Sequence, residues 1–157
     1  ISNWETTGVK LQNGKVIHSD ITVMATGGNA QLLGGIDIFV NDKKVNINST
    51  SWYRGMMFSG IPNLFAHAGY INFSWTARCE IVSRRICRTV DYMKKKQLTS
   101  CTPKYLGEKS KPSIQANYVL RAMDQFPNRT YKFYQNYLVE YLIVKWTKIN
   151  DGAVDFK

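Results

Sequence analysis

The turn Gly-Tyr-Ile-Asn at residues 69–72 is the place where residue types and spacing best suit ligand binding. It separates a short apolar segment, residues 64–68, from a long amphipathic stretch that follows Ser74. In open α/β sheets, ligands lie beyond the carboxyl ends of strands, where the start of a helix offers unpaired N–H groups and a positive dipole end. A strand, turn and helix also form purely structural crossovers, so the pattern alone allows both interpretations.

The other side chains that could do chemistry are scattered. His18 and His67 lack a cysteine or carboxylate at ligand spacing, so no metal site is expected. His67 is expected to be a core histidine or to lie near a cofactor, and Cys101 to be a free surface thiol. The sequence has no complete glycine-rich phosphate loop and no visible catalytic triad. The catalytic residues therefore stay unknown, and residues 1–157 lack the usual parts of an active site.

The composition is that of a globular chain of one domain. Among 157 residues, 44% are hydrophobic and the net charge is +10, with no apolar run close to the roughly 18 residues of a membrane span. The opening ISNWETTG resembles neither a signal peptide nor a natural start, so we expect the chain to begin inside a protein. Three cysteines, expected to be reduced, favour a cytoplasmic location.

Basic residues are concentrated between residues 78 and 111. This stretch holds ten lysines and arginines against three acidic residues, a local balance of +7. A solvated helix face is one interpretation, and attraction of nucleic acid, anionic lipid or a phosphorylated cofactor is the other.

The first half of the chain predicts β-hairpins and short strands. Residues 9–12 and 15–18 flank Asn13-Gly14, a dipeptide typical of two-residue hairpin turns. Residues 36–40 and 45–47 predict a second, exposed hairpin, and residues 48–60 a loop. The apolar runs 21–26 and 64–68 predict buried strands.

The second half predicts helices. From Ser74, a plausible N-cap, apolar residues recur at helical spacing for about 20 residues. They are Trp75, Cys79, Val82, Ile86, Val90 and Met93. Residues 99–113 predict a polar linker or surface loop, residues 114–125 a helix, and residues 136–146 a helix with one apolar side. The apolar side of the helix predicted at 136–146 consists of Tyr137, Leu138, Tyr141, Leu142 and either Lys145 or Trp146.

Several segments occur together in a distinctive order. They are G-x5-D-x2-V-x-A-T-G (14–27), WYRGMMFSGIPNLF (52–65), GYINFSWTARCEIVSRRICR (69–88), QNYLVEYLIVKW (135–146) and NDGAVDF (150–156). In this order they resemble the C-terminal part of a flavin-dependent Baeyer-Villiger monooxygenase of the ethionamide-activating type, a class B flavoprotein monooxygenase.

The resemblance implies an α/β fold, as a C-terminal fragment of a flavoprotein with two dinucleotide-binding domains. Residues 1–62 would end the NADPH-binding domain and form the return linker, 63–98 would supply the last strand and helix of the FAD-binding domain, and 99–157 a helical extension. The parent enzyme would use FAD and NADPH to insert one oxygen atom of O₂ into a ketone or to oxidise a sulfur or nitrogen atom. The glycine-rich loops belong upstream, so the isolated chain is expected to be inactive and to hold neither cofactor tightly.

The resemblance also assigns site residues. Cofactor-binding positions are Ala25, Thr26, Gly27, Gly69, Tyr70, Asn72, Trp75 and Thr76. The first three would end the strand that leaves the nicotinamide domain and act as a hinge, whereas the others would face the flavin. Relatives place Gly-Asp where this chain has Gly69-Tyr70, so that Asp contact is not transferred. The substrate-pocket positions, for which core packing is an equal alternative, are Trp52, Tyr53, Arg54, Met56 and Met57.

The expected partners follow from both lines of reasoning. The resemblance implies a small apolar ketone or thioether and O₂ as substrates. Open edges of the strands at 21–26 and 64–68 predict association with other chains, including further copies of this one. The alternative function is a basic, non-enzymatic binding module for nucleic acid or anionic membrane. Because the aromatic residues fall in apolar runs, nucleic acid is not expected, while peripheral membrane contact remains an interpretation of the basic stretch.

Overall fold

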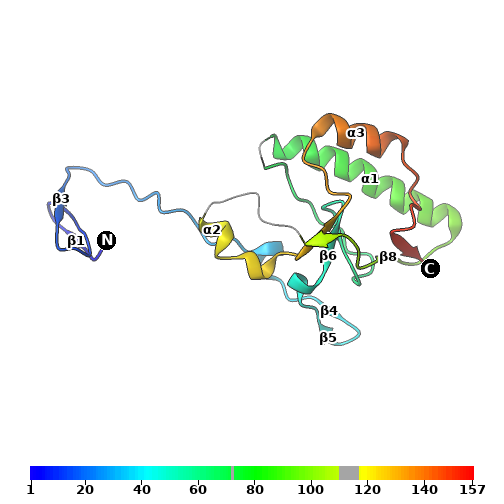
Figure 1. Ribbon diagram of the computed structural model, residues 1–157, viewed down its shortest axis with the longest axis horizontal. Coiled ribbons are helices and arrows are strands. Elements are labelled where there is room, and N and C mark those ends of the chain that lie inside the picture. Colours follow the sequence, from blue (N-terminus) through cyan, green and yellow to red (C-terminus); the bar gives the residue numbers. More distant parts are fainter. Residues whose placement is uncertain (72, 110–116) are drawn as a thin grey trace.

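The computed structural model describes residues 1–71, 73–109 and 117–157. It combines helices and sheets, which confirms a mixed α/β chain. A small N-terminal sheet lies apart from the main body, to which an extended segment connects it (Figure 1). This sheet consists of β1 (Asn3–Glu5), β2 (Gly8–Lys10) and β3 (Val16–His18), all antiparallel. The hairpin predicted around Asn13-Gly14 is confirmed, but not its two-residue turn: the N–H of Leu11 donates to the Lys15 carbonyl at 2.8 Å, and of the two residues only Gly14 takes a positive φ.

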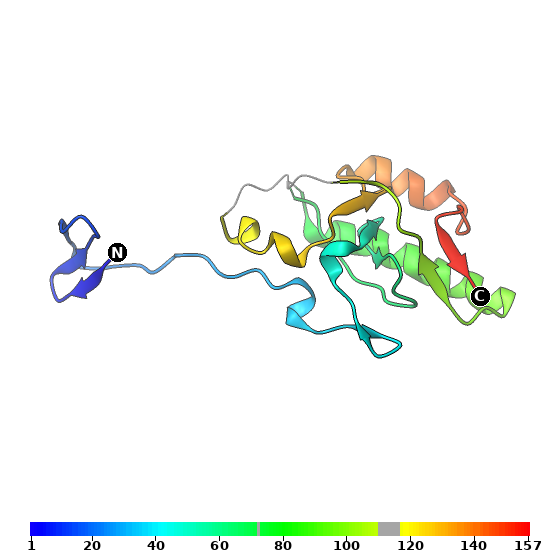
Figure 2. The same cartoon turned by 60° about the horizontal axis from the view of Figure 1, so that its bottom comes forward.

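The strand predicted at residues 21–26 is wrong for this chain. Residues 21–31 form no helix or strand, and Ile21, Val23 and Met24 are 70–83% exposed. Figures 1 and 2 show the segment leaving the N-terminal sheet and running alone toward the main body. A strand exists only where a neighbour pairs with its N–H and C=O groups, and the described chain places none beside this segment.

The main body is built around a four-stranded sheet of order β7-β6-β10-β9. Its members are β6 (Ser51–Tyr53), β7 (Met57–Phe58), β9 (Glu108–Lys109) and β10 (Arg129–Tyr131). β6 and β10 are parallel, with Trp52 opposite Thr130. The loop predicted at 48–60 is therefore wrong: it forms the central hairpin, in which Arg54 and Gly55 both take positive φ to turn the chain.

Short pairings complete the main body. β8 (Cys101–Pro103) is antiparallel to β11 (Val154–Phe156). β4 (Phe39–Val40) pairs with β5 (Lys43–Lys44), which confirms a second hairpin, but its return strand is Lys43–Lys44 and not the predicted 45–47. Single 3₁₀ turns occupy Ile47–Ser49 and Met123–Gln125, whereas Leu32–Gly35 is an irregular turn in which Leu33 and Gly34 take left-handed φ.

Four expectations about residues 64–68 and 99–113 are corrected. Residues 64–68 are not a strand; the segment is instead fixed by the N–H of Ala66, which donates to the Met56 carbonyl at 2.8 Å. His67 is exposed there and not a core residue. Residues 101–103 and 108–109 are strands and not loop, and Cys101 is fully buried, so it is no surface thiol. Burial raises the pKa of its thiol.

Two helices cover one side of the sheet (Figure 2). α1 spans Trp75–Lys96 and α3 spans Tyr137–Trp146, which confirms both predicted helices. The predicted helix at 114–125 is shorter, since α2 covers only Asn117–Leu120; residues 114–116 lie outside the described residues. None of the described helices combines the length and apolar character needed to cross a membrane.

The buried faces of these helices differ from those that the apolar pattern predicts. In α1 the buried side chains are Arg78, Ile81, Val82, Arg85 and Thr89. Of the predicted stripe, only Val82 is fully buried, and Trp75 is 63% exposed. In α3 only Glu140 and Val144 are buried, whereas Leu138 and Leu142 face outward. Buried ionic groups therefore orient both helices.

Candidate functional site

The N-terminus of α1 presents free backbone N–H groups. Ser74 is the N-cap, and its hydroxyl accepts a hydrogen bond from the N–H of Ala77 at 3.3 Å. Trp75 and Thr76 are exposed, and among the described residues no acceptor bonds to their N–H groups. The first turn contains no acidic residue, so nothing there neutralises the positive end of this 22-residue helix. This end of α1 can stabilise a negative or electron-rich group.

The turn before α1 is held tightly against the helix. Gly69 is buried, and a Cβ atom on it would collide with the indole ring of Trp75. The structure thus brings these two predicted cofactor residues into contact, and only glycine permits the approach. The N–H of Ile71 donates to Oε1 of Gln135 at 3.0 Å, which fixes the end of the turn. The predicted position Asn72 lies outside the described residues.

Tyr70 points into the protein and not toward the helix N-terminus. It is 1% exposed, and its hydroxyl donates to Oε2 of Glu140 at 2.7 Å. The same carboxylate receives two hydrogen bonds from Arg78, at 3.1 Å from Nε and 2.8 Å from Nη2. Both charged side chains are almost fully buried. The side chain of Tyr70 is therefore not available to a ligand, and only its backbone atoms are.

Arg78 connects this ion pair to the rest of the core. Its guanidinium donates to the carbonyl of Ala68 and, at 2.8 Å, to that of Arg54. It also lies 4.5 Å from the ring centroid of Phe133, which is a cation–π arrangement. A Cβ at Gly55 would come within 2.9 Å of the guanidinium, so glycine is needed there. One side chain from the second turn of α1 thus anchors the 66–70 segment, the 54–55 turn and α3.

The five predicted pocket residues lie in the core. Trp52 is 9% exposed, and Tyr53, Arg54, Met56 and Met57 are 4% or less. Two surface depressions on the described residues, of about 420 and 590 Å³, are lined by none of them. The indole N–H of Trp52 is buried, and no described residue accepts a hydrogen bond from it. In this structure the five side chains pack against other residues, and their role as a substrate pocket stays a prediction.

Asp151 is the centre of a second buried cluster. Its Oδ2 accepts hydrogen bonds from the hydroxyl of Tyr53 at 2.9 Å, from Arg54 at 3.1 Å and from Lys132 at 2.8 Å. Burial raises the pKa of Asp151, but bonds from Lys132, the Ala153 backbone, Tyr53 and Arg54 outweigh it and lower the pKa to about 2. This carboxylate is therefore ionised throughout the physiological range and ties the central hairpin to the C-terminal segment.

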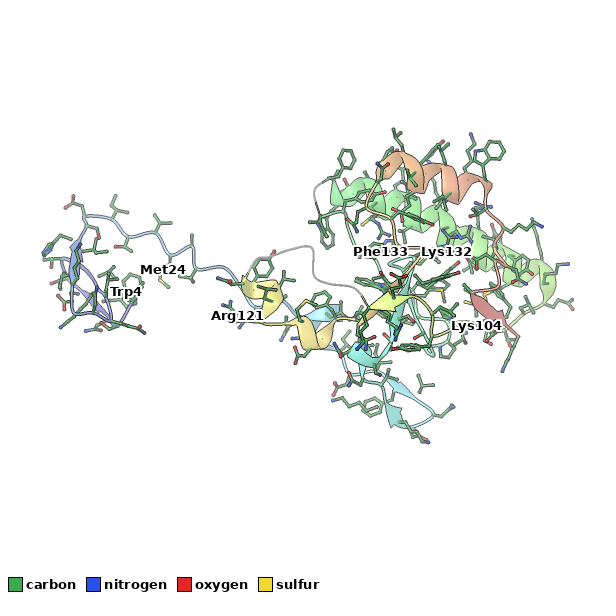
Figure 3. All side chains as sticks on the ribbon, in the orientation of Figure 1. Trp4, Met24, Lys104, Arg121, Lys132 and Phe133 are labelled. Carbon is green, nitrogen blue, oxygen red and sulfur yellow. The ribbon has the colours of Figure 1, made fainter. Side chains whose placement is uncertain are left out.

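The proposed hinge is remote from the α1 N-terminus. Ala25, Thr26 and Gly27 are exposed in the extended segment, and Gly27 takes a φ of 78°. Figure 3 shows Met24 on this segment, far from Phe133 and Lys132 beneath the two helices. The structure does not bring the two halves of the predicted cofactor site together, and the role of residues 25–27 stays a prediction.

The basic stretch 78–111 uses several of its arginines internally. Arg85 donates to the carbonyls of Thr147 and Lys148, and Arg88 to those of Val144 and Thr147. These bonds satisfy carbonyls at the C-terminal end of α3, where cations are favoured. Together with the buried Arg78, this removes much of the charge that the alternative function, a basic binding module, would need on the surface.

Comparisons with known proteins agree with the class of protein that the sequence motifs suggest. The chain is 35% identical over 164 residues to the FAD-containing monooxygenase EthA of Mycobacterium tuberculosis, an alignment that covers 99% of the chain and 34% of that protein. It is 31% identical to the probable FAD-binding monooxygenase AlmA of an Acinetobacter species, covering 99% of the chain and 33% of that protein. The putative FAD-containing monooxygenase MymA of M. tuberculosis is 29% identical over the same shares.

These matches confirm the resemblance: over 99% of its length the chain is similar to part of proteins named FAD-containing or FAD-binding monooxygenases. Within that class, it is similar to the ethionamide-activating type named from its motifs. The chain spans about a third of the length of the curated relatives it matches. No protein-family profile and no solved structure matches it.

Proposed function

We propose that residues 1–157 form the C-terminal portion of an FAD- and NADPH-dependent monooxygenase. Its reaction is insertion of one oxygen atom of O₂ into a ketone, or oxidation of a sulfur or nitrogen atom. The similarity over 99% of the chain to proteins named FAD-containing monooxygenases carries this proposal. Because residues 1–157 contain no glycine-rich dinucleotide loop, the cofactors would be held mainly by the remainder of a longer protein.

In this proposal the α1 N-terminus faces the flavin. Bound FAD, reduced by NADPH, would supply the electrons that activate O₂, one oxygen atom entering the substrate and the other leaving as water. The free N–H groups of Trp75 and Thr76 would stabilise negative charge at the pyrimidine edge of the ring. Arg78, held by Glu140 at 2.8 Å, supports the proposal because it fixes the helix without placing a competing charge at its N-terminus.

The remaining assignments concern substrate and movement. Met56, Met57 and Trp52 are buried in this structure, so they would have to become accessible in the longer protein before they could offer apolar and polarisable surface to a small ketone or thioether. The buried indole N–H of Trp52 fits this role, because no described residue accepts its hydrogen bond and a substrate oxygen could accept it. The segment 25–27 would act as the hinge between domains. Without those domains, the apolar residues at 21–24 favour association with other chains.

The test compares the chain with the longer protein that contains it. The longer protein is expected to be purified with visible flavin absorbance and to consume NADPH faster when a ketone or thioether is added. The chain alone is expected to do neither. The proposal is contradicted if the longer protein retains no flavin. It is also contradicted if no ketone or thioether raises the rate of NADPH consumption.

A further inference from the structure

The outward face of α3 is apolar although the helix buries a glutamate. Its exposed side chains include Leu138, Leu142 and Trp146, which are 69%, 53% and 74% exposed, and Tyr141 at 39%. These positions are three or four residues apart and therefore share one side of the helix. We call Leu138, Tyr141, Leu142, Lys145 and Trp146 the outer face of α3. Such a face, contiguous and uncovered, marks an interaction surface.

The charges on this helix narrow the choice of partner. Lys145 lies within the outer face, and Lys148 follows the helix directly. The only carboxylate in residues 137–148 is Glu140, which is buried and paired with Arg78. The outer face therefore combines apolar side chains with positive charge and presents no exposed negative charge.

Lys145 in the middle of the apolar side argues against a dry protein interface. The cores of protein interfaces are depleted in lysine, because its ammonium group must lose its water there. At a lipid surface the same side chain extends to the phosphates while its carbon stem stays among the apolar groups. The Nζ atom of Lys145 lies 5.3 Å from the ring centroid of Trp146, and tryptophan also favours the headgroup region.

We propose that the outer face of α3 binds the surface of an anionic phospholipid bilayer. Leu138, Leu142 and Trp146 insert among the acyl chains near the headgroups, and Lys145 and Lys148 contact lipid phosphates. This is a peripheral contact that leaves α3 lying parallel to the membrane plane. It requires no flavin, so it stands or falls independently of the proposed oxygenase activity.

The experiment is cosedimentation of the chain with vesicles of phosphatidylcholine, with or without phosphatidylglycerol. Binding is expected only with phosphatidylglycerol and is expected to weaken as salt is added. Trp146→Ser and Leu142→Ser are each expected to weaken binding on the order of tenfold. The double variant Lys145→Ser/Lys148→Ser is expected to weaken it roughly thirtyfold. Ile17→Ser, which changes a 48% exposed apolar residue of the N-terminal sheet, is the matched control and should bind normally.

Three results would overturn the proposal. The first is equal binding of the chain to vesicles with and without phosphatidylglycerol, or binding of the Trp146→Ser variant that is as strong as that of the unchanged chain. The second is a dimer in gel filtration that Trp146→Ser abolishes, which would make the outer face a contact between copies. The third is loss of vesicle binding in the longer protein that contains residues 1–157, which would show that another part of the polypeptide covers this face.

Discussion

Replacing Arg78 by methionine should destabilise the chain far more than replacing Arg84, although both arginines lie on α1 and pair with a glutamate. Arg78→Met leaves the buried carboxylate of Glu140 without its cation, which costs about 3–5 kcal/mol. It also removes charged hydrogen bonds to two carbonyls, each contributing about 1.5–3 kcal/mol. The exposed Arg84–Glu80 pair, 2.7 Å long, contributes at most about 0.5 kcal/mol.

The assay is urea unfolding followed by circular dichroism, analysed for the free energy of unfolding. Domains of this kind have about 5–15 kcal/mol of stability, so Arg78→Met can fail to fold. Glu140→Gln keeps the shape of the side chain but leaves the buried Arg78 guanidinium without its anion and replaces one acceptor oxygen by an NH₂ donor, so it should also cost about 3–5 kcal/mol. The reasoning is refuted if Arg78→Met and Arg84→Met differ by less than about 1 kcal/mol, or if a double-mutant cycle of Arg78 and Glu140 shows no coupling.

Three further predictions concern other parts of the main body. Asp151 has a pKa near 2, below its unfolded value, so its stabilisation is complete above about pH 4 and lost as the pH falls toward 2. Asp151→Asn should therefore unfold about 1–2 kcal/mol more easily at pH 7, and a gap that persists at pH 2 would contradict this assignment. Gly69→Ala should displace the Trp75 indole and change tryptophan fluorescence, whereas Gly28→Ala, which meets no atom, should not. Asn136→Ala should cost about 1 kcal/mol in urea unfolding because its side chain caps α3, and an unchanged midpoint would argue against that cap.

Elements whose signal is local could be predicted from the sequence. The hairpin around Asn13-Gly14 depends on a local turn in which Gly14 takes a positive φ, and α1 depends on a long helical period with a serine N-cap. By contrast, β6 and β10 are three residues each and become strands only because residues 51–53 meet residues 129–131. Strands this short carry no periodicity, so nothing in either segment alone distinguishes them from loops.

The buried arginines were missed for a related reason. Sequence patterns place arginine on the surface, because an unpaired charge is costly to bury. Arg78 and Arg85 are buried because Glu140 and the carbonyls after α3 provide partners more than 60 residues away. One signal was available: Arg78, Val82, Arg85 and Thr89 recur at helical spacing and define the buried face of α1.

The ion pair between Arg78 and Glu140 links the two surfaces to which functions are proposed here. Burying Leu138 and Leu142 of α3 would be far more favourable in free energy than burying Glu140. Hydrophobicity alone would therefore turn the outer face of α3 toward the core. Glu140 faces inward because Arg78 and Tyr70 donate hydrogen bonds to its carboxylate in the core. The two leucines, on the opposite side of α3, therefore face outward. The same bonds fix the second turn of α1 and thereby its exposed N-terminus. The ion pair between α1 and α3 thus has two consequences. It sets the direction of the N–H groups of α1 that are proposed to face the flavin. It also leaves exposed the outer face of α3 that is proposed to bind lipid.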